Sequence, residues 1–148
     1  VYIKTIIVPQ SAIDENGHVN NVTYVQWMQD IAVEHYASIG GIEAQGPDAT
    51  WVVREHKIEY LLPVPYQRHP LDVQLWFGRL GGSSIDVCYE VCSPRETAGE
   101  TGQQIYARAT TVVVKVDAET GRPLRLSEIE REAWAPYVGE PLHYGHRR

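Results

Sequence analysis

The residues best suited to chemistry lie in one short segment, D-E-N-G-H-V-N-N at positions 14–21. It holds two carboxylates, three amides and an imidazole, and Gly17 permits a positive φ and close approach of a ligand to the main chain. Asp14 could act as a nucleophile or as a base that activates water. An Asx-rich loop that only caps a helix has the same composition, so a purely structural role stays open.

A helix must follow this loop. Apolar side chains recur at three- and four-residue spacing, which predicts one broad buried face. These positions are Tyr24, Trp27, Met28, Ile31, Ala32, His35, Tyr36 and Ile39. Asn20 or Asn21 can cap the start of the helix, and Gly40-Gly41 can end it. The unpaired amides at the start carry partial positive charge, so a carbonyl oxygen that gains negative charge would be stabilised there.

Strand-like segments surround the helix. Residues 1–8 form the first, closed by Pro9, and four more follow in succession at about 51–62, 71–80, 84–92 and 104–116. The short links between them favour an antiparallel meander. The run of β-branched residues in Val112–Val116 predicts a central strand that is covered on both faces.

The end of the chain contains a second, shorter helix. Ser127 and Glu130 have the spacing of a capping box at its start. Residues 139–148 are expected to form a flexible tail. No repeat or linker divides residues 1–148, which predicts one α+β domain: a twisted five-stranded antiparallel sheet wrapped around one long helix. Exposed sheet edges favour a homo-oligomer that covers them.

Composition excludes several classes of function. The net charge of −6 argues against general binding to nucleic acid or to a membrane surface. No apolar stretch approaches the ~20 residues of a membrane span and no signal-peptide pattern is present, so we expect a cytoplasmic protein. Cys88 and Cys92, ~13 Å apart on a strand, are expected to be reduced. No metal-ligand spacing, nucleophile elbow, P-loop or dinucleotide fingerprint is found, so neither metal nor cofactor is expected.

The string D-E-N-G-H-V-N-N-V-T-Y, followed by Val25-Gln26-Trp27, resembles the signature of hot-dog-fold acyl thioesterases. The resemblance extends to both the 4-hydroxybenzoyl-CoA thioesterase-like branch and the acyl-ACP thioesterase branch, and it covers roughly residues 1–126. It implies a hot-dog fold and hydrolysis of acyl- or aroyl-CoA, or acyl carrier protein, thioesters. It also implies a homodimer or homotetramer whose pocket lies between subunits.

The resemblance makes Asp14 the catalytic carboxylate and the backbone amide near Asn21 the group that polarises the thioester carbonyl. Asn16 and His18 match residues that hold water or orient the acid, although His18 could instead satisfy a loop carbonyl. Where the acyl-ACP branch offers a second acid, this chain has Pro63, which favours a mechanism with one carboxylate.

Other residues are expected to contact the substrate: Gly17, Asn20, Tyr24, Trp27, Met28 and His56. The aromatic residues and Met28 should serve mainly as core. His56 could instead be an ordinary, partly buried histidine with no role in binding. Six arginines could hold CoA phosphates or dock an acyl carrier protein: Arg54, Arg68, Arg79, Arg95, Arg122 and Arg125. A hot-dog hydratase or dehydratase and a non-catalytic acyl-CoA-binding protein remain alternative functions.

Overall fold

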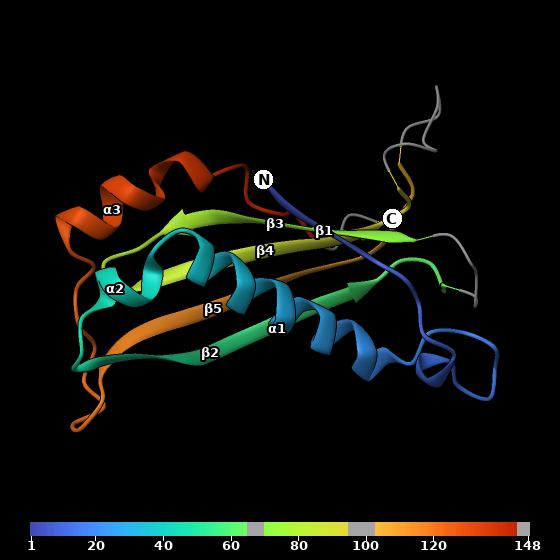
Figure 1. Ribbon diagram of the computed structural model, residues 1–148, viewed down its shortest axis with the longest axis horizontal. Helices are drawn as coiled ribbons and strands as arrows, with labels where there is room; N and C mark the ends of the chain where they lie inside the picture. Colours follow the sequence, from blue (N-terminus) through green and yellow to red (C-terminus); the bar gives the residue numbers. More distant parts are fainter. Residues whose placement is uncertain (65–69, 95–102, 145–148) are drawn as a thin grey trace.

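The computed structural model describes residues 1–64, 70–94 and 103–144 (Figure 1). Its elements in chain order are β1 (Tyr2–Ile6), η1 (Gln10–Ala12), α1 (Asn21–Ser38), α2 (Gly41–Gln45), β2 (Ala49–Tyr60), β3 (Leu71–Leu80), β4 (Ser84–Cys92), β5 (Ile105–Asp117), α3 (Glu128–Trp134) and η4 (Ala135–Tyr137). The predicted α+β architecture is confirmed: five antiparallel strands form one sheet, and α1 lies across one of its faces.

The strand order, β1-β3-β4-β5-β2, differs from the predicted meander. β2 does not pair with β3 but lies at the opposite edge, where it pairs with β5, and β1 pairs with β3. The segment after β2 explains part of this difference, because Pro63 cannot donate to a ladder and the chain leaves the sheet there. β5 has a neighbour on both sides, yet β4 rather than β5 is the middle strand.

Both ends of α1 follow the sequence prediction. The Asn20 side chain caps the start by accepting a hydrogen bond from the Val22 amide at 2.9 Å. Gly40, with φ of 72°, turns the chain out of the helix. The short helix α2 begins immediately afterwards and was not predicted. Gly41 at its start packs under the Tyr36 ring, where a Cβ would overlap the ring, so this position needs glycine.

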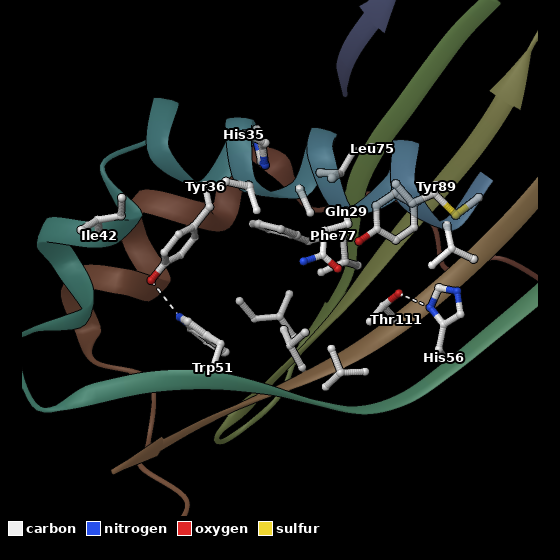
Figure 2. A pocket seen from close by; sticks show the side chains of 18 residues that line it. Gln29, His35, Tyr36, Ile42, Trp51, His56, Leu75, Phe77, Tyr89 and Thr111 are labelled. Atoms are coloured by element: carbon white, nitrogen blue, oxygen red, sulfur yellow. Dashed lines mark hydrogen bonds between the residues drawn. The ribbon is translucent and has the colours of Figure 1, made fainter. Parts of the chain in front are cut away.

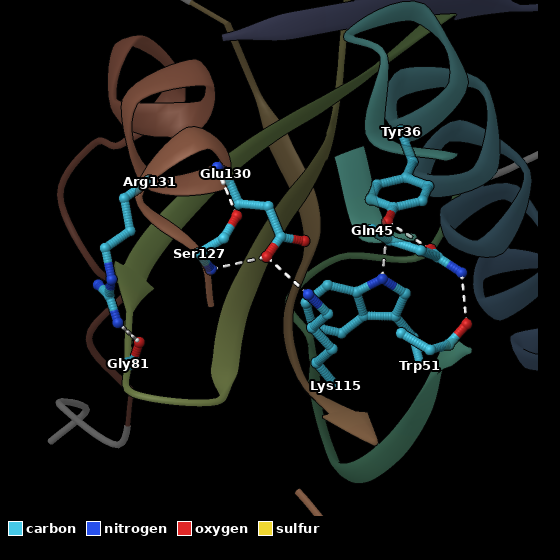
Figure 3. A network of polar contacts seen from close by, with 9 residues as sticks. Tyr36, Gln45, Trp51, Gly81, Lys115, Ser127, Glu130 and Arg131 are labelled. Atoms are coloured by element: carbon cyan, nitrogen blue, oxygen red, sulfur yellow. Dashed lines mark hydrogen bonds and ion pairs between the residues drawn. The ribbon is translucent and has the colours of Figure 1, made fainter. Parts of the chain in front are cut away.

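A buried polar network holds α3 against the sheet (Figure 3). The predicted capping box is confirmed, because Ser127 and Glu130 exchange side-chain to backbone hydrogen bonds. Glu130 also accepts from Lys115 Nζ of β5 at 2.7 Å, and Arg131 donates to the Gly81 carbonyl at 2.7 Å. Trp134 of α3 then reaches the core, where its ring lies 6.1 Å from that of Trp51.

The C-terminal segment differs from the flexible tail that the sequence predicted. Residues 139–144 lie against β3 and β5: the Gly139 amide donates to the Phe77 carbonyl at 2.7 Å, and Trp76 Nε1 donates to the Glu140 carbonyl at 2.7 Å. Tyr144 reaches Thr110 at 2.8 Å. Paired backbone groups and a bonded aromatic ring stabilise the segment, and residues 145–148 lie outside the described part of the chain. Cys88 and Cys92 are both buried thiols, as expected for reduced cysteines.

Candidate active site and acyl pocket

Asp14 closes the tight turn that carries the candidate chemistry. Its amide donates to the His18 carbonyl at 2.8 Å, and its Oδ1 accepts from the amides of Asn16 and His18 at 2.9 and 3.2 Å. Gly17, with φ of 77°, allows this reversal. Within the described residues, both hydrogen bonds to the carboxylate end on Oδ1. Oδ2 is therefore the oxygen available to a water or a substrate.

The turn is attached directly to the start of α1. The Asn20 amide donates to the Ala12 carbonyl and the Val19 amide to the Val64 carbonyl, each at 2.8 Å. Asn21 is the first helical residue, where the amide has no partner within the helix. The predicted carboxylate and the predicted oxyanion donor thus lie at the two ends of one short, braced loop. The Asn20 side-chain oxygen serves as the cap, as the sequence predicted, and its contact with substrate stays a prediction.

The other predicted residues near the loop divide by burial. Asp14 and His18 are half-buried, whereas Asn16 and Gly17 are exposed. Tyr24 is buried, with its ring 5.8 Å from Trp27 and 5.3 Å from Tyr60, and burial raises the pKa of Tyr24 to about 12. Tyr24 therefore belongs to the core, as the sequence mainly predicted.

A cavity of about 630 Å³ lies between α1 and the sheet (Figure 2). Its wall is mostly apolar and is formed by Val25, Met28, Gln29, Ala32, Val33, His35, Tyr36, Ile42, Trp51, Val53, His56, Leu75, Phe77, Ile85, Val87, Tyr89, Thr111 and Val113. The volume is in the range of small-molecule sites, ~300–1,000 Å³. Met28 and His56 are the predicted substrate contacts that line it. The loop at residues 14–21 does not, and the wall begins one helical turn later, at Val25.

Polar side chains gather under the N-terminal half of α1 in this cavity. His56 Nδ1 and Thr111 Oγ1 lie 2.7 Å apart, and the two residues are cross-strand partners on β2 and β5. Tyr89 of β4 lies beside Thr111, and Gln29 approaches from α1 (Figure 2). Burial lowers the pKa of His56 and raises the pKa of Tyr89 to about 12, so both side chains are neutral at neutral pH.

Sequence reasoning missed Gln29, Tyr89 and Thr111. The helical periodicity placed Gln29 outside the buried face of α1. The alternation of residues along a strand separates its two faces, but it does not show whether the face with Tyr89 or Thr111 meets the helix. The pairing of β2 with β5 is what brings Thr111 to His56. No local signal reports that pairing.

The opposite end of the cavity is closed by aromatic side chains. The Tyr36 hydroxyl donates to Gln45 Oε1 of α2, and Trp51 Nε1 donates to the Tyr36 oxygen at 2.8 Å (Figure 3). Gln45 Nε2 donates in turn to the Ala49 carbonyl at 2.7 Å. This chain of bonds holds both rings in place, so the far end of the cavity has a rigid shape.

Among residues 1–64, 70–94 and 103–144, no group of three or more His, Cys, Asp or Glu side chains is placed to bind a metal ion. In the same described ranges, no helix has the length and apolarity needed to cross a membrane. Of the candidate arginines, Arg68 and Arg95 lie outside the described residues.

Comparison with known proteins agrees with this fold. The chain belongs to the thioesterase-like superfamily, whose family model matches residues 8–134. The fold is the hot-dog fold of these proteins, as the resemblance of the loop implied. A search of curated proteins found no match.

Solved structures have the same architecture. The PA5185 protein of Pseudomonas aeruginosa is 25% identical, with a TM-score of 0.76 over 93% of this chain and 92% of that one. The SAV2348 protein of Staphylococcus aureus, solved in complex with CoA, is 17% identical, with a TM-score of 0.78 over 97% and 89%. The Dynemicin thioesterase, studied for its binding of polyenes, is 17% identical, with a TM-score of 0.77 over 95% and 99%.

Proposed function

We propose that this protein hydrolyses acyl or aroyl thioesters of CoA, or of an acyl carrier protein, to the free acid and the thiol. The observation that carries the proposal is the apolar cavity of about 630 Å³ beneath a helix whose capped start adjoins the turn that holds Asp14. The cavity suits the apolar part of an acyl group, and the loop at the helix start suits the thioester. Membership of the thioesterase-like superfamily supports the same reaction class.

The proposed chemistry uses one carboxylate and the helix start. The Asn21 amide would donate to the thioester carbonyl oxygen and stabilise the negative charge that develops there. Asp14 Oδ2 would either take a proton from a water that attacks the carbonyl carbon or attack that carbon itself. In the first case the carbon–sulfur bond then breaks, and the thiolate takes up the proton and leaves as the thiol. In the second case the carbon–sulfur bond breaks to give a mixed anhydride with Asp14, the thiolate takes up a proton, and a water hydrolyses the anhydride to the free acid and the Asp14 carboxylate. Asn16 and His18 would orient the water, and no cofactor is required.

We also propose that a second copy of the chain completes the pocket. Val25, Val33, Ile42 and Val53 line the cavity and are exposed at the same time, which places an apolar opening on the surface. β2 beside it is an edge strand, which among the described residues pairs with β5 on one side only. A homodimer, or a homotetramer built from it, would cover both. The CoA bound to SAV2348 supports CoA as the thiol, and a cytoplasmic location stays a prediction from the sequence.

Thiol release tests the reaction. The protein should release thiol from at least one member of a series of short, medium, long and aromatic acyl-CoAs. Asp14→Asn should lower kcat by at least ~100-fold, because it removes the charge. It keeps the oxygen that accepts from Asn16 and His18, so the turn should survive. Glu15→Gln is the matched control: an exposed neighbouring carboxylate that should leave kcat unchanged. Equal activity in Asp14→Asn and the native protein would refute the role of Asp14.

A non-catalytic acyl-CoA-binding protein is the second candidate. It is favoured by one observation, that the wall of the cavity within a single chain does not include the loop at residues 14–21. Tight acyl-CoA binding without release of thiol would support this candidate against hydrolysis. Water addition to enoyl-CoA in the same assays would indicate instead a hydratase on this scaffold.

A further inference from the structure

Four polar side chains form a cluster in the wall of the acyl cavity: His56, Thr111, Tyr89 and Gln29. We call them the polar cluster. They come from β2, β5, β4 and α1, so the cluster spans the cavity from the sheet to the helix (Figure 2). Their neighbours in the wall, including Leu75, Val87 and Val113, are aliphatic. A cavity that binds only hydrocarbon has no need of such a cluster.

The two hydroxyl groups of the cluster are buried, whereas His56 and Gln29 are exposed to solvent. Thr111 and Tyr89 are only 7% and 4% exposed, and a buried hydroxyl is costly unless it is hydrogen-bonded. The bond to Thr111 uses His56 Nδ1, which directs Nε2 to the other side of the ring. In the described part of the chain neither His56 Nε2 nor the Gln29 amide has a hydrogen-bond partner. The cluster therefore retains both donors and acceptors for a ligand.

The chemistry of the cluster selects a neutral ligand group. His56 and Tyr89 are both uncharged at neutral pH because burial disfavours their ionised forms. Neutral imidazole, amide and hydroxyl groups can together donate to and accept from one alcohol. A carboxylate or ammonium group would enter an apolar wall without a partner of opposite charge, which is unfavourable.

The geometry points to a hydroxyl group near the far end of a medium-length acyl chain as the ligand of the polar cluster, which makes hydroxyacyl thioesters the preferred substrate class. The thioester part of this inference rests on the proposed function. Gln29 lies two turns beyond Asn21, or ~12 Å along the helix, so the cluster is distant from the proposed position of the carbonyl. A hydroxyl beside the carbonyl would not reach it.

Calorimetric binding to the full chain tests the inference without catalysis. The probes are decanoic acid and its hydroxy isomers, with the hydroxyl moved along the chain. We expect an isomer with its hydroxyl near the far end of the chain to bind about tenfold more tightly than decanoic acid, as one additional hydrogen bond implies. Thr111→Val should bring that ratio close to one. Thr110→Val is the matched control, because Thr110 bonds Tyr144 on the outer face of the sheet, and it should keep the ratio.

His56→Leu provides a second variant at a more exposed position and should also bring the ratio close to one. The inference is overturned if no isomer binds more tightly than decanoic acid, if nothing binds, or if both variants keep the native ratio.

The acyl-CoA assay separates this inference from the proposed function. Binding preference without release of thiol would refute hydrolysis and leave the polar cluster as a hydroxyl site. Thiol release at equal kcat/KM from decanoyl-CoA and all hydroxydecanoyl-CoA isomers would refute the hydroxyl site and leave hydrolysis standing.

Discussion

His35 shows how one residue can affect stability in a pH-dependent way. It is only 2% exposed, and its ring lies 5.0 Å from Tyr2, 5.4 Å from Phe77 and 5.0 Å from Tyr137. Its Nε2 has no hydrogen-bond partner among the described residues. Burial lowers the pKa of His35, so the folded protein holds a neutral imidazole.

We therefore expect the free energy of unfolding to decrease as the pH falls below about 6.5, the ordinary pKa of histidine. In that range the unfolded chain takes up a proton that the folded chain excludes, whereas above it His35 contributes no pH dependence. When the free energy of unfolding, measured with urea, is plotted against pH over this range, the slope should be shallower for His35→Phe than for the native protein. The slope should not vanish, because the pKa of His56 is lowered too. An unchanged slope would contradict the prediction.

Two ion pairs illustrate how the surrounding elements determine the contribution of a contact. Lys115 of β5 and Glu130 of α3 lie 2.7 Å apart, and Lys4 of β1 and Glu34 of α1 lie 2.8 Å apart. The distances are nearly equal, but the first pair is buried and the second is exposed to solvent. Water screens the exposed pair, whereas loss of one partner leaves an unpaired charge in the buried pair.

Lys115→Met should lower the free energy of unfolding by about 3–5 kcal/mol, because Glu130 would remain buried without its cation. Glu130 also belongs to the capping box, so α3 should loosen from the sheet. Lys4→Met is the matched control and should change stability little. Urea unfolding of the three proteins gives the comparison, and similar losses for both variants would rule out burial as the deciding factor.

We expect the edge formed by β2 to decide the oligomeric state of the protein. Val53 on this strand is 64% exposed and also lines the cavity. Contact with a second copy would therefore bury the Val53 side chain and close the pocket at the same time. We expect the native protein to sediment as a dimer or tetramer at micromolar concentration and Val53→Lys to shift it toward monomer, with weaker binding of acyl chains. Ile129→Lys, at a similarly exposed apolar position on α3, should change neither the oligomeric state nor the binding of acyl chains. A native monomer would refute the shared pocket.

Much of the local structure followed from short stretches of sequence. The spacing of Tyr24, Met28 and Ile31 predicted α1, Asn20 its first turn, and Ser127 with Glu130 the start of α3. β3 and β4 begin and end where the alternation predicted. The candidate loop was recognised from its residues, and its position at the helix start is confirmed. The catalytic roles in it stay predictions.

The sequence by itself determined helices, caps, strands and the composition of the loop, because each depends on side chains a few residues apart. Only the tertiary structure decided that β2 crosses the sheet to β5, that His56 meets Thr111, and that Gln29 faces a cavity. Those outcomes depend on how all five strands close around α1. Alternative long-range strand pairings compete with one another. The difference in free energy between them depends on the whole sheet and cannot be inferred from a local sequence pattern.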